Sequence, residues 1–317
     1  MLERDLTALA TAEGRMVGTV GHDIAKDYIV ERLRDIGVQP YSNDSLELLY
    51  SHQEVNFVNV VGQIEGVKSD LPPILLGAHH DTCGPYPGAD DNAAAVAVLL
   101  AVAEQLSQAA PDRTAILAFF DAEEPPYFLG PAMGSIRFFE DQLRQDIHCA
   151  IVMDLVGHDL PVPGMEDLLF VTGMESDPGF QEALKAADPG ENLRIVPTLN
   201  LYVGDLSDHY IFRMNKRPYL LLTCGRWDHY HMPSDTVDRL NLEKIRVVAD
   251  YLGALVKSLS FIQLNGPFEG VDTTEAELHF MRKNLLPSLS AMGLDVDLGS
   301  RDDIDKLVRM MILEFGL

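Results

Sequence analysis

Cysteine is scarce in this sequence: only Cys83, Cys149 and Cys224 occur among 317 residues. An odd, small set of cysteines excludes a disulfide scaffold and is typical of a protein in a reducing compartment. The N-terminus also lacks the basic segment followed by an apolar core that marks a signal peptide. We therefore expect a cytoplasmic protein, and the alternative is a mature secreted form whose leader has been trimmed.

Basic residues are few as well. Lysine and arginine number 24 against 49 aspartates and glutamates, which gives a formal net charge of −25 at pH 7. Because nucleic acids and anionic lipids require a basic surface, we predict neither a nucleic-acid nor a membrane partner. Long apolar runs are also missing: the longest, Ala93–Ala103, is well short of the roughly 20 residues of a membrane-spanning helix.

What the chain does contain is an ordinary globular mixture, with 47% hydrophobic and 23% charged residues. Residues 22–36 have the apolar spacing of a helix, and Gly37 stands where a C-terminal cap belongs. Short runs rich in β-branched and aromatic residues follow, and several are continuously apolar, as in strands buried on both faces. The expected strands are Leu46–Tyr50, Val55–Val61, Ile74–Ala78, Thr114–Phe120, Cys149–Leu155, Leu168–Thr172, Leu193–Val196 and Tyr219–Thr223.

Helical patterns alternate with these runs. They lie at 93–106, 135–145, 178–187, 207–214 and 242–260. The alternation predicts an α/β protein: a three-layer α/β/α sandwich with a mostly parallel or mixed sheet of about eight strands.

The alternation stops near Leu264, and Asn265-Gly266-Pro267 interrupts the chain. Residues 274–317 have the pattern of two or three amphipathic helices. We therefore predict a main domain over residues 1–264 and a C-terminal helical extension over residues 265–317.

Polar residues follow the first of the buried strands. Residues 74–78 lead directly into His79-His80-Asp81. Residues two apart on an extended chain share a face, so Asp81 can hydrogen-bond the imidazole of His79, as beside a metal-bound histidine. Taken alone, such a pair is more typical of an ordinary strand end.

An aspartate pair precedes the next helical pattern, in the stretch Gly88-Ala-Asp90-Asp91-Asn. Aspartates at this position usually cap a helix N-terminus. The functional interpretation is that one of the two carboxylates bridges two cations.

Two adjacent glutamates, Glu123 and Glu124, stand just beyond the apolar strand 114–120. Carboxylates are costly to bury there unless cations pair with them. Adjacent side chains diverge, so one can bind a metal while the other faces the bound water as general base. An acidic helix start is the alternative.

Two more strand ends complete the pattern. Asp154 lies near the end of the strand that starts at Cys149, and His229 and His231 follow the strand 219–223. Because ligands in open α/β sheets sit beyond the carboxyl ends of strands, we expect all five segments to meet at one edge of the sheet. Two histidines with three or four carboxylates suit two Zn²⁺ or similar ions.

In this order, the motifs His-x-Asp, Gly-Ala-x-Asp-Asn, Glu-Glu, Asp-Leu-x-Gly and His-x-x-x-Asp-Thr resemble those of the co-catalytic dizinc exopeptidases. That family includes bacterial leucyl-type aminopeptidases, glutamate carboxypeptidases and glutaminyl cyclases. The resemblance implies two zinc ions per chain, both contacted by Asp91. It further implies that His79 and Asp154 complete one site, and that Glu124 and His231 complete the other.

The resemblance, which covers roughly residues 12–262, also implies an activity. Glu123 would be the general base that generates a metal-bridged hydroxide, and Asp81 would orient His79. A free N-terminal amine suits so acidic a site. We therefore predict a zinc metallopeptidase of the aminopeptidase type, with its catalytic domain in 1–264, that acts on a peptide or aminoacyl substrate.

Two alternatives share the fold that the resemblance implies. A glutaminyl cyclase-like acyltransferase would use one zinc, but such enzymes typically have tryptophan where Tyr230 stands and serine where Asn92 stands. A carboxypeptidase would need a cation for the terminal carboxylate; Arg226, Arg213 and Arg217 are candidates, and a surface salt bridge is the commoner role of such residues.

Substrate contacts are predicted in three places. The loop after the two glutamates is longer than is usual in the family, and it offers Tyr127 and Phe128 as pocket walls; ordinary loop packing is the alternative. The segment that contains Asp208 and His209 resembles a recurrent substrate-side segment of the family. Tyr230 adjoins the expected ligand histidine.

Overall fold

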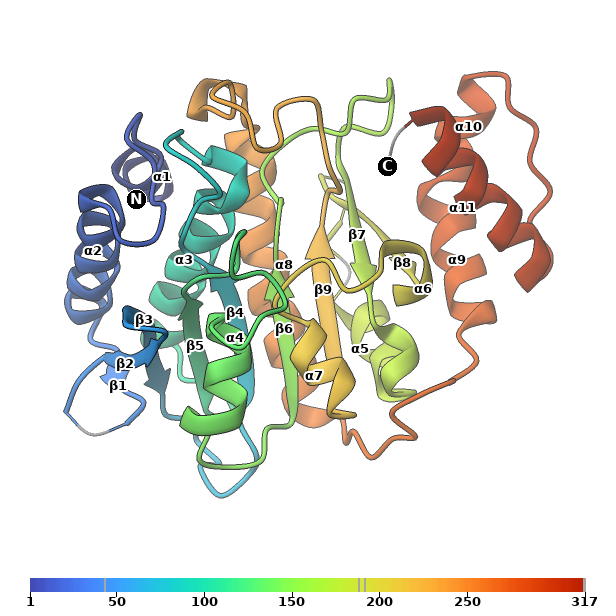
Figure 1. Ribbon diagram of the computed structural model, residues 1–317. Coiled ribbons are helices and arrows are strands. Elements are labelled where there is room, and N and C mark those ends of the chain that lie inside the picture. The colour runs from blue at the N-terminus through green and yellow to red at the C-terminus, as the bar shows by residue number, and fades with distance from the viewer. Residues whose placement is uncertain (43, 188, 191, 316–317) are drawn as a thin grey trace.

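The computed structural model describes residues 1–42, 44–187, 189–190 and 192–315. Its centre is a nine-stranded mixed sheet with helices on both faces, which confirms the predicted three-layer α/β/α fold (Figure 1). The strands are β1 (Gln39–Pro40), β2 (Glu47–His52), β3 (Val55–Ile64), β4 (Ile74–His79), β5 (Ala115–Phe120), β6 (Cys149–Met153), β7 (Leu168–Thr172), β8 (Arg194–Thr198) and β9 (Tyr219–Thr223).

The sheet has the order β1-β3-β5-β4-β6-β9-β7-β8, and β2 pairs with β3. Strands β5, β4, β6 and β9 are parallel neighbours, whereas β3 and β7 join this block in antiparallel orientation. The register places Leu76 beside Leu117 on one side and Ile151 on the other. The carboxyl ends of β4, β5, β6 and β9 therefore lie together at one edge of the sheet, where a site is expected.

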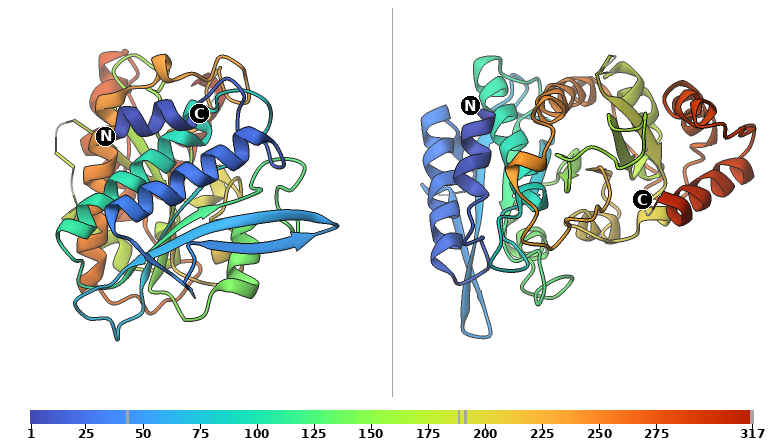
Figure 2. Two further views of the ribbon diagram at one scale, coloured as in Figure 1. Left: turned by 90° about the vertical axis from the view of Figure 1, so that its left-hand side faces the viewer. Right: turned by 90° about the horizontal axis from the view of Figure 1, so that it is seen from above.

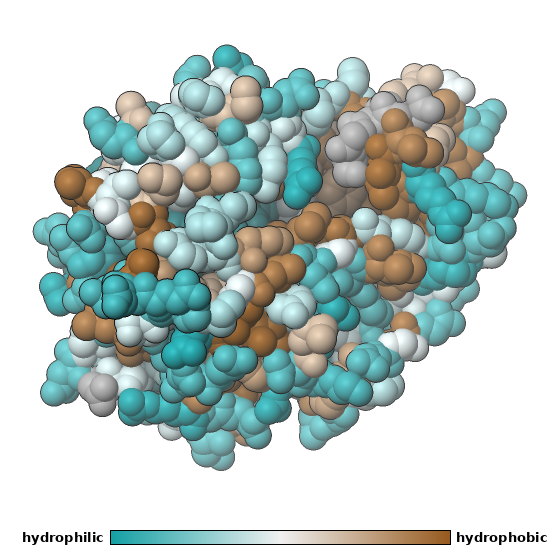
Figure 3. Space-filling view, viewed as in Figure 1, coloured by the Kyte–Doolittle hydropathy of each residue, from teal (hydrophilic) through white to brown (hydrophobic). Residues whose placement is uncertain are grey.

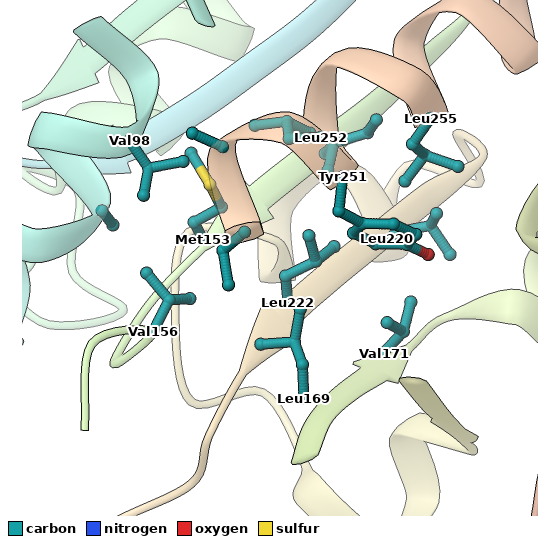
Figure 4. Packing of buried hydrophobic residues seen from close by; sticks show 14 of the residues in the cluster. Val98, Met153, Val156, Leu169, Val171, Leu220, Leu222, Tyr251, Leu252 and Leu255 are labelled. Atoms are coloured by element: carbon teal, nitrogen blue, oxygen red, sulfur yellow. The ribbon is translucent and has the colours of Figure 1, made fainter. Parts of the chain in front are cut away.

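One face of the sheet carries the larger core. It is covered by α1 (Leu2–Leu9), α2 (Val20–Ile36), α3 (Ala95–Gln108), α5 (Gly179–Ala186) and α8 (Leu242–Phe261). Alternate strand residues such as Met153 and Leu222 point to this side and pack with Val98 of α3 and Leu252 of α8 (Figure 4). Seen from above, the two helical layers enclose the sheet (Figure 2).

The opposite face carries a smaller core. Short helices cover it: α4 (Gly134–Arg137), the turn Phe138–Gln142, α6 (Asn200–Val203) and α7 (Tyr210–Met214). Their Phe138 and Phe212 pack on alternate strand residues such as Phe120 and Leu221. Only part of this face is covered, and the uncovered part lies over β7, β8 and β9, next to the C-terminal helices (Figure 1).

The C-terminal segment folds into α9 (Thr274–Asn284), α10 (Leu286–Ala291) and α11 (Arg301–Phe315). Helix α9 lies along the edge strand β8, where the Asn284 side chain donates a hydrogen bond to the Ile195 carbonyl at 2.7 Å. Covering an edge strand protects its unpaired backbone groups. The division of the chain at residue 264 remains a proposal.

The structure differs from the sequence analysis in two helical regions. No helix was predicted at the N-terminus, where α1 places Leu6 and Leu9 in the core. The helix predicted over 135–145 is present over residues 134–142, where α4 continues directly into the wider helical turn Phe138–Gln142. The predicted cap of α2 is confirmed, because Gly37 adopts the left-handed conformation with φ of 86°. Among the described residues, no helix is long and apolar enough to cross a membrane.

Candidate metal centre

The end of β4 supplies the first site residues. His79 and Asp81 are both 1% exposed, and their Nδ1 and Oδ1 atoms lie 3.3 Å apart. The Asp81 carboxylate also accepts hydrogen bonds from the backbone N–H groups of Glu123 at 3.1 Å and Glu124 at 3.0 Å. One buried carboxylate thus fixes the ring orientation of His79 and holds the glutamate pair that follows β5.

The aspartate pair lies on the irregular turn Ala89–Ala94 that leads into α3. Asp91 is not helical, with φ of −110° and ψ of 86°. The backbone N–H groups of Asp90 and Asp91 donate to the Asp235 carboxylate at 2.9 and 3.1 Å. This turn is therefore built to direct the Asp91 side chain toward the sheet edge rather than to cap the helix.

Asp91 lies between two histidines from distant segments. Its Oδ1 is 3.3 Å from Nε2 of His79, and its Oδ2 is 3.1 Å from Nε2 of His231. On the first side, Oδ1 of Asp154 lies 3.6 Å from the same His79 nitrogen. On the second side, both Glu124 oxygens lie 3.1 Å from Nε2 of His231. The Asp91 carboxylate is therefore shared by two groups of candidate ligand atoms, one at His79 and one at His231.

Glu123 stands beside these groups. Its side chain is 5% exposed, and its Oε2 lies 3.8 Å from Nε2 of His79. Burial raises the pKa of Glu123 well above its usual value. A raised pKa favours the protonated form, and a carboxyl group that binds and releases a proton beside a ligand cluster fits a general acid–base role.

The charges of the cluster fit a cation site. Burial and then the charge of Asp91 raise the pKa of Glu124 to about 8. For Asp91, hydrogen bonds from His231 and His79 outweigh the effect of burial and lower its pKa. For His231, hydrogen bonds to the two carboxylates outweigh burial and raise its pKa to about 10. Carboxylates and imidazoles are ligands that Zn²⁺ binds in proteins. A bound cation would offset the cost of burying several carboxylates together.

Two further chain segments support this edge. Arg15 is 1% exposed, and its guanidinium donates to the carbonyls of His80 at 2.9 Å and Gly88 at 2.9 Å. His158 lies 2.6 Å from Asp90, and the two side chains are fully buried. Sequence reasoning missed both residues, because a single arginine or histidine within a loop has no local pattern.

Cys83 also lies at the cluster, within 4.8 Å of ligand atoms of Glu124 and His231. It is partly exposed, whereas the other two cysteines are buried. Its place two residues past Asp81 in the sequence suggests a fortuitous metal contact, and an ordinary loop thiol is the commoner alternative.

A pocket of about 540 Å³ opens from the cluster. Of the predicted substrate residues, Phe128 and Tyr230 line it, and Arg226 stacks on Tyr230 with its guanidinium carbon 4.9 Å from the ring centre. Among the described residues, Tyr127 does not line the pocket; it packs edge-on against Phe57 with ring centres 5.0 Å apart. The role of each residue remains a prediction.

Asp208 and His209 lie in the segment that borders the pocket. Both are fully buried, and burial raises the pKa of Asp208 to about 7. Nε2 of His209 lies 3.0 Å from Oδ1 of Asn200 and 3.1 Å from the Gly204 carbonyl, so this ring holds the segment from inside. Their positions indicate a supporting place next to the pocket, and the predicted substrate contacts are untested.

Comparisons with known proteins relate the chain to a peptidase family. The model of peptidase family M28 matches residues 59–256. An uncharacterised protein of Escherichia coli, YfbL, is 32% identical over 212 residues; the match covers 57% of this chain and 65% of YfbL, less than two thirds of that protein.

Two solved structures share the fold. The LapA aminopeptidase of Legionella pneumophila superimposes with a TM-score of 0.66 at 18% identity, over 82% of this chain and 71% of its own. A glutaminyl cyclase of Bacteroides thetaiotaomicron gives a TM-score of 0.64 at 20% identity, over 81% of this chain and 96% of its own. At such identities the likeness shows the fold alone.

Proposed function

The chain belongs to peptidase family M28, and on this basis we propose that it is a zinc-dependent aminopeptidase that removes N-terminal residues from peptides. The site uses two zinc ions. Supporting this proposal, the family match spans the segments that carry the whole ligand cluster, from His79 to His231.

One observation carries the proposal: Asp91 presents one carboxylate oxygen to each of two ligand groups. His79 and Asp154 would hold one ion with Asp91, and Glu124 and His231 would hold the other. An aspartate placed between two histidines favours two metals over one. A cyclase with a single zinc ion is the alternative.

Bound zinc supplies positive charge that polarises a carbonyl and acidifies water. The residues of the chain perform the remaining tasks. Glu123 accepts a proton from the attacking water and donates it to the leaving amine. Asp81 holds the His79 ring by its Nδ1 side.

The acidic surroundings favour a substrate amine. Glu123, Glu124, Asp91 and Asp154 line the pocket where the scissile bond would lie. A protonated N-terminal amine finds hydrogen-bond acceptors among these carboxylates, whereas a C-terminal carboxylate finds no donor among these four side chains. Arg226 lines the same pocket and would be the partner of a C-terminal carboxylate in a carboxypeptidase. The experiment below therefore also measures the release of C-terminal residues.

The test combines metal counting with a substrate panel. Zinc content is measured by elemental analysis, and the protein is assayed with aminoacyl-anilides, with their N-acetylated forms, and with a peptide that begins with glutamine. We expect two zinc equivalents and hydrolysis only of substrates with a free amine. One equivalent with cyclisation of glutamine would establish the cyclase instead, and release of C-terminal residues would establish the carboxypeptidase.

A further inference from the structure

Three of the predicted metal ligands stand on irregular segments rather than on strands. Asp91 lies on the turn Ala89–Ala94, Asp154 follows β6, and His231 belongs to the loop that follows β9. All three side chains line the pocket, and apolar residues gather at the hollow beside the C-terminal helices (Figure 3). Because an open pocket gives these ligands no support, contacts within the fold have to fix the segments that carry them.

Asp90, the residue before Asp91, joins the first two of these segments. Its Oδ1 accepts a hydrogen bond from the Gly157 N–H at 2.6 Å, and its Oδ2 lies 2.6 Å from Nδ1 of His158. The side chains of Asp90 and His158 are both fully buried. The turn that carries Asp91 is therefore bonded twice to the loop that follows Asp154.

Trp227 brings the third segment to the same point. Its ring stacks on the His158 imidazole, with the ring centres 4.7 Å apart and the planes 13° from parallel. The Trp227 carbonyl accepts a hydrogen bond from the Tyr230 N–H at 3.0 Å, in the turn that leads directly to His231. The stack therefore connects the His231 loop to the buried pair of Asp90 and His158.

The remaining contacts of these residues leave this connection as their visible role. Nε2 of His158 has no hydrogen-bond partner among the described residues, so the imidazole is held by Asp90 at one edge and by Trp227 on its face. The Asp235 carboxylate anchors the far end of the His231 loop to the turn Ala89–Ala94. The stack of Trp227 fixes the beginning of the same loop.

We propose that Asp90, His158 and Trp227 form a buried junction that positions Asp91 and His231 to bind zinc. This inference rests on the zinc centre of the proposed function. The three residues act through the segments that carry the ligands and are positioning residues. A metal-binding side chain has to be held within about 0.5 Å of its productive position, which a single loop does not achieve without such partners.

The experiment removes the stack and the hydrogen bond separately. Trp227→Leu abolishes the stack, whereas Trp227→Phe keeps an aromatic ring in its place. His158→Phe keeps the stack and removes the hydrogen bond to Asp90. Phe139→Leu is the matched control, because Phe139 is half-buried and packs edge-on against Phe212 of α7, outside the segments that carry the ligands.

Zinc affinity is measured by competition with a coloured chelator, and thermal unfolding of the zinc-free protein measures stability. We expect Trp227→Leu and His158→Phe to bind the ion at His231 about 10- to 100-fold more weakly. His231→Ala identifies that ion, because it should be lost there. Trp227→Phe should stay within about threefold of the wild type, since a stacked ring remains. Phe139→Leu should lower the thermal midpoint without changing zinc affinity.

Trp227 is the sole tryptophan of the chain, so its fluorescence follows the junction directly. Zinc added to the chelator-treated wild type should change the emission as the ion at His231 binds. In His158→Phe the midpoint of this change should move to at least about tenfold higher zinc concentration. A contact that only stabilises the fold would lower the thermal midpoint and leave the zinc midpoint unchanged.

The inference is wrong if Trp227→Leu and His158→Phe both fold and bind zinc as the wild type does. Should His158→Phe fail to fold, Trp227→Leu decides alone, because Trp227 is only partly buried. Zinc binding is measured without substrate, which separates this inference from the proposed function. Weaker zinc binding in Trp227→Leu with no hydrolysis by the wild type would support the junction and overturn the aminopeptidase. Hydrolysis by the wild type with unchanged zinc affinity in Trp227→Leu would do the reverse.

Discussion

The metal edge of the pocket and its far end at α11 place different requirements on the amino-acid sequence. The metal edge is made of carboxylates and imidazoles whose atoms lie within 3.1 to 3.8 Å of one another, from segments as far apart as His79 and His231. The far end, at α11, is made of apolar side chains. Metal chemistry requires particular residue types at particular places, whereas an apolar wall requires only volume and a lack of charge.

The two ends are also held differently. At the metal edge, buried carboxylates such as Asp81 and Asp235 accept backbone N–H groups. At the far end, side chains of the C-terminal helices supply the contacts, such as Asp305 with Tyr202 and Asn284 with the Ile195 carbonyl. Changes at the metal edge should therefore affect kcat or metal content, and changes at the far end should affect KM for hydrophobic substrates.

The largest effect is expected from the glutamate pair. Glu123→Gln removes the proposed base and should lower kcat by about 10³-fold or more while both zinc ions remain. Glu124→Gln, one residue away, should lose zinc from the site it shares with His231. Elemental analysis and single-substrate kinetics on both variants separate the roles. Retained activity in Glu123→Gln would show that another group takes the proton.

Metal removal is expected to have the next largest effect. Chelation would leave Asp91, Glu124 and Asp154 buried together with two histidines to balance them. A ligand at a thousandfold excess over its Kd stabilises a protein by about 4 kcal/mol. We expect a lower thermal midpoint after chelation, which added zinc restores. An unchanged midpoint would show that the cluster is stable without a cation.

Much of this architecture could be predicted from the sequence, for reasons seen in particular elements. Strand β4 is a short continuous apolar run that ends in polar residues, and its length favours a buried strand over a helix. Strand β1 has only two residues, too short for any periodic signal. Helix α1 has apolar residues at Leu2, Leu6 and Leu9, but it is a short segment without a side-chain cap.

The site divides in the same way. His79, Glu124 and His231 stand at or beyond strand ends within motifs that resemble a family, and the structure brings them close to Asp91 as expected. Arg15 was not, because its importance comes from backbone carbonyls that reach it only in the folded chain. Met311 was not either, since an apolar residue on an amphipathic helix is ordinary until the cavity it borders is known.

The segment that joins the two ends offers a test by pH. Burial lowers the pKa of His209 from 6.5 to about 4. Between these values the unfolded chain binds a proton that the folded protein does not, so stability is full above pH 6.5 and decreases as the pH falls toward 4. The complete loss attributable to His209 is about 3 kcal/mol.

Urea unfolding at pH 7 and pH 5 measures this loss. His209→Gln should reduce the difference between the two pH values, whereas His279→Gln, at an exposed position on α9, should leave it unchanged. Equal pH dependence in the wild type and His209→Gln would mean that other groups dominate acid unfolding.

The smallest effect is expected at the far end, where Tyr202→Phe removes the hydrogen bond between Tyr202 and Asp305. Losing one such bond costs about 1 kcal/mol of stability. Because that bond holds α11 against the pocket, KM for a leucyl substrate should rise a few fold while kcat stays constant. Tyr28→Phe removes a similar bond to Asp5, 2.6 Å long, between α2 and α1. The Tyr28→Phe variant should lose comparable stability without a change in KM. Equal kinetics in the two variants would contradict a substrate-binding role for α11.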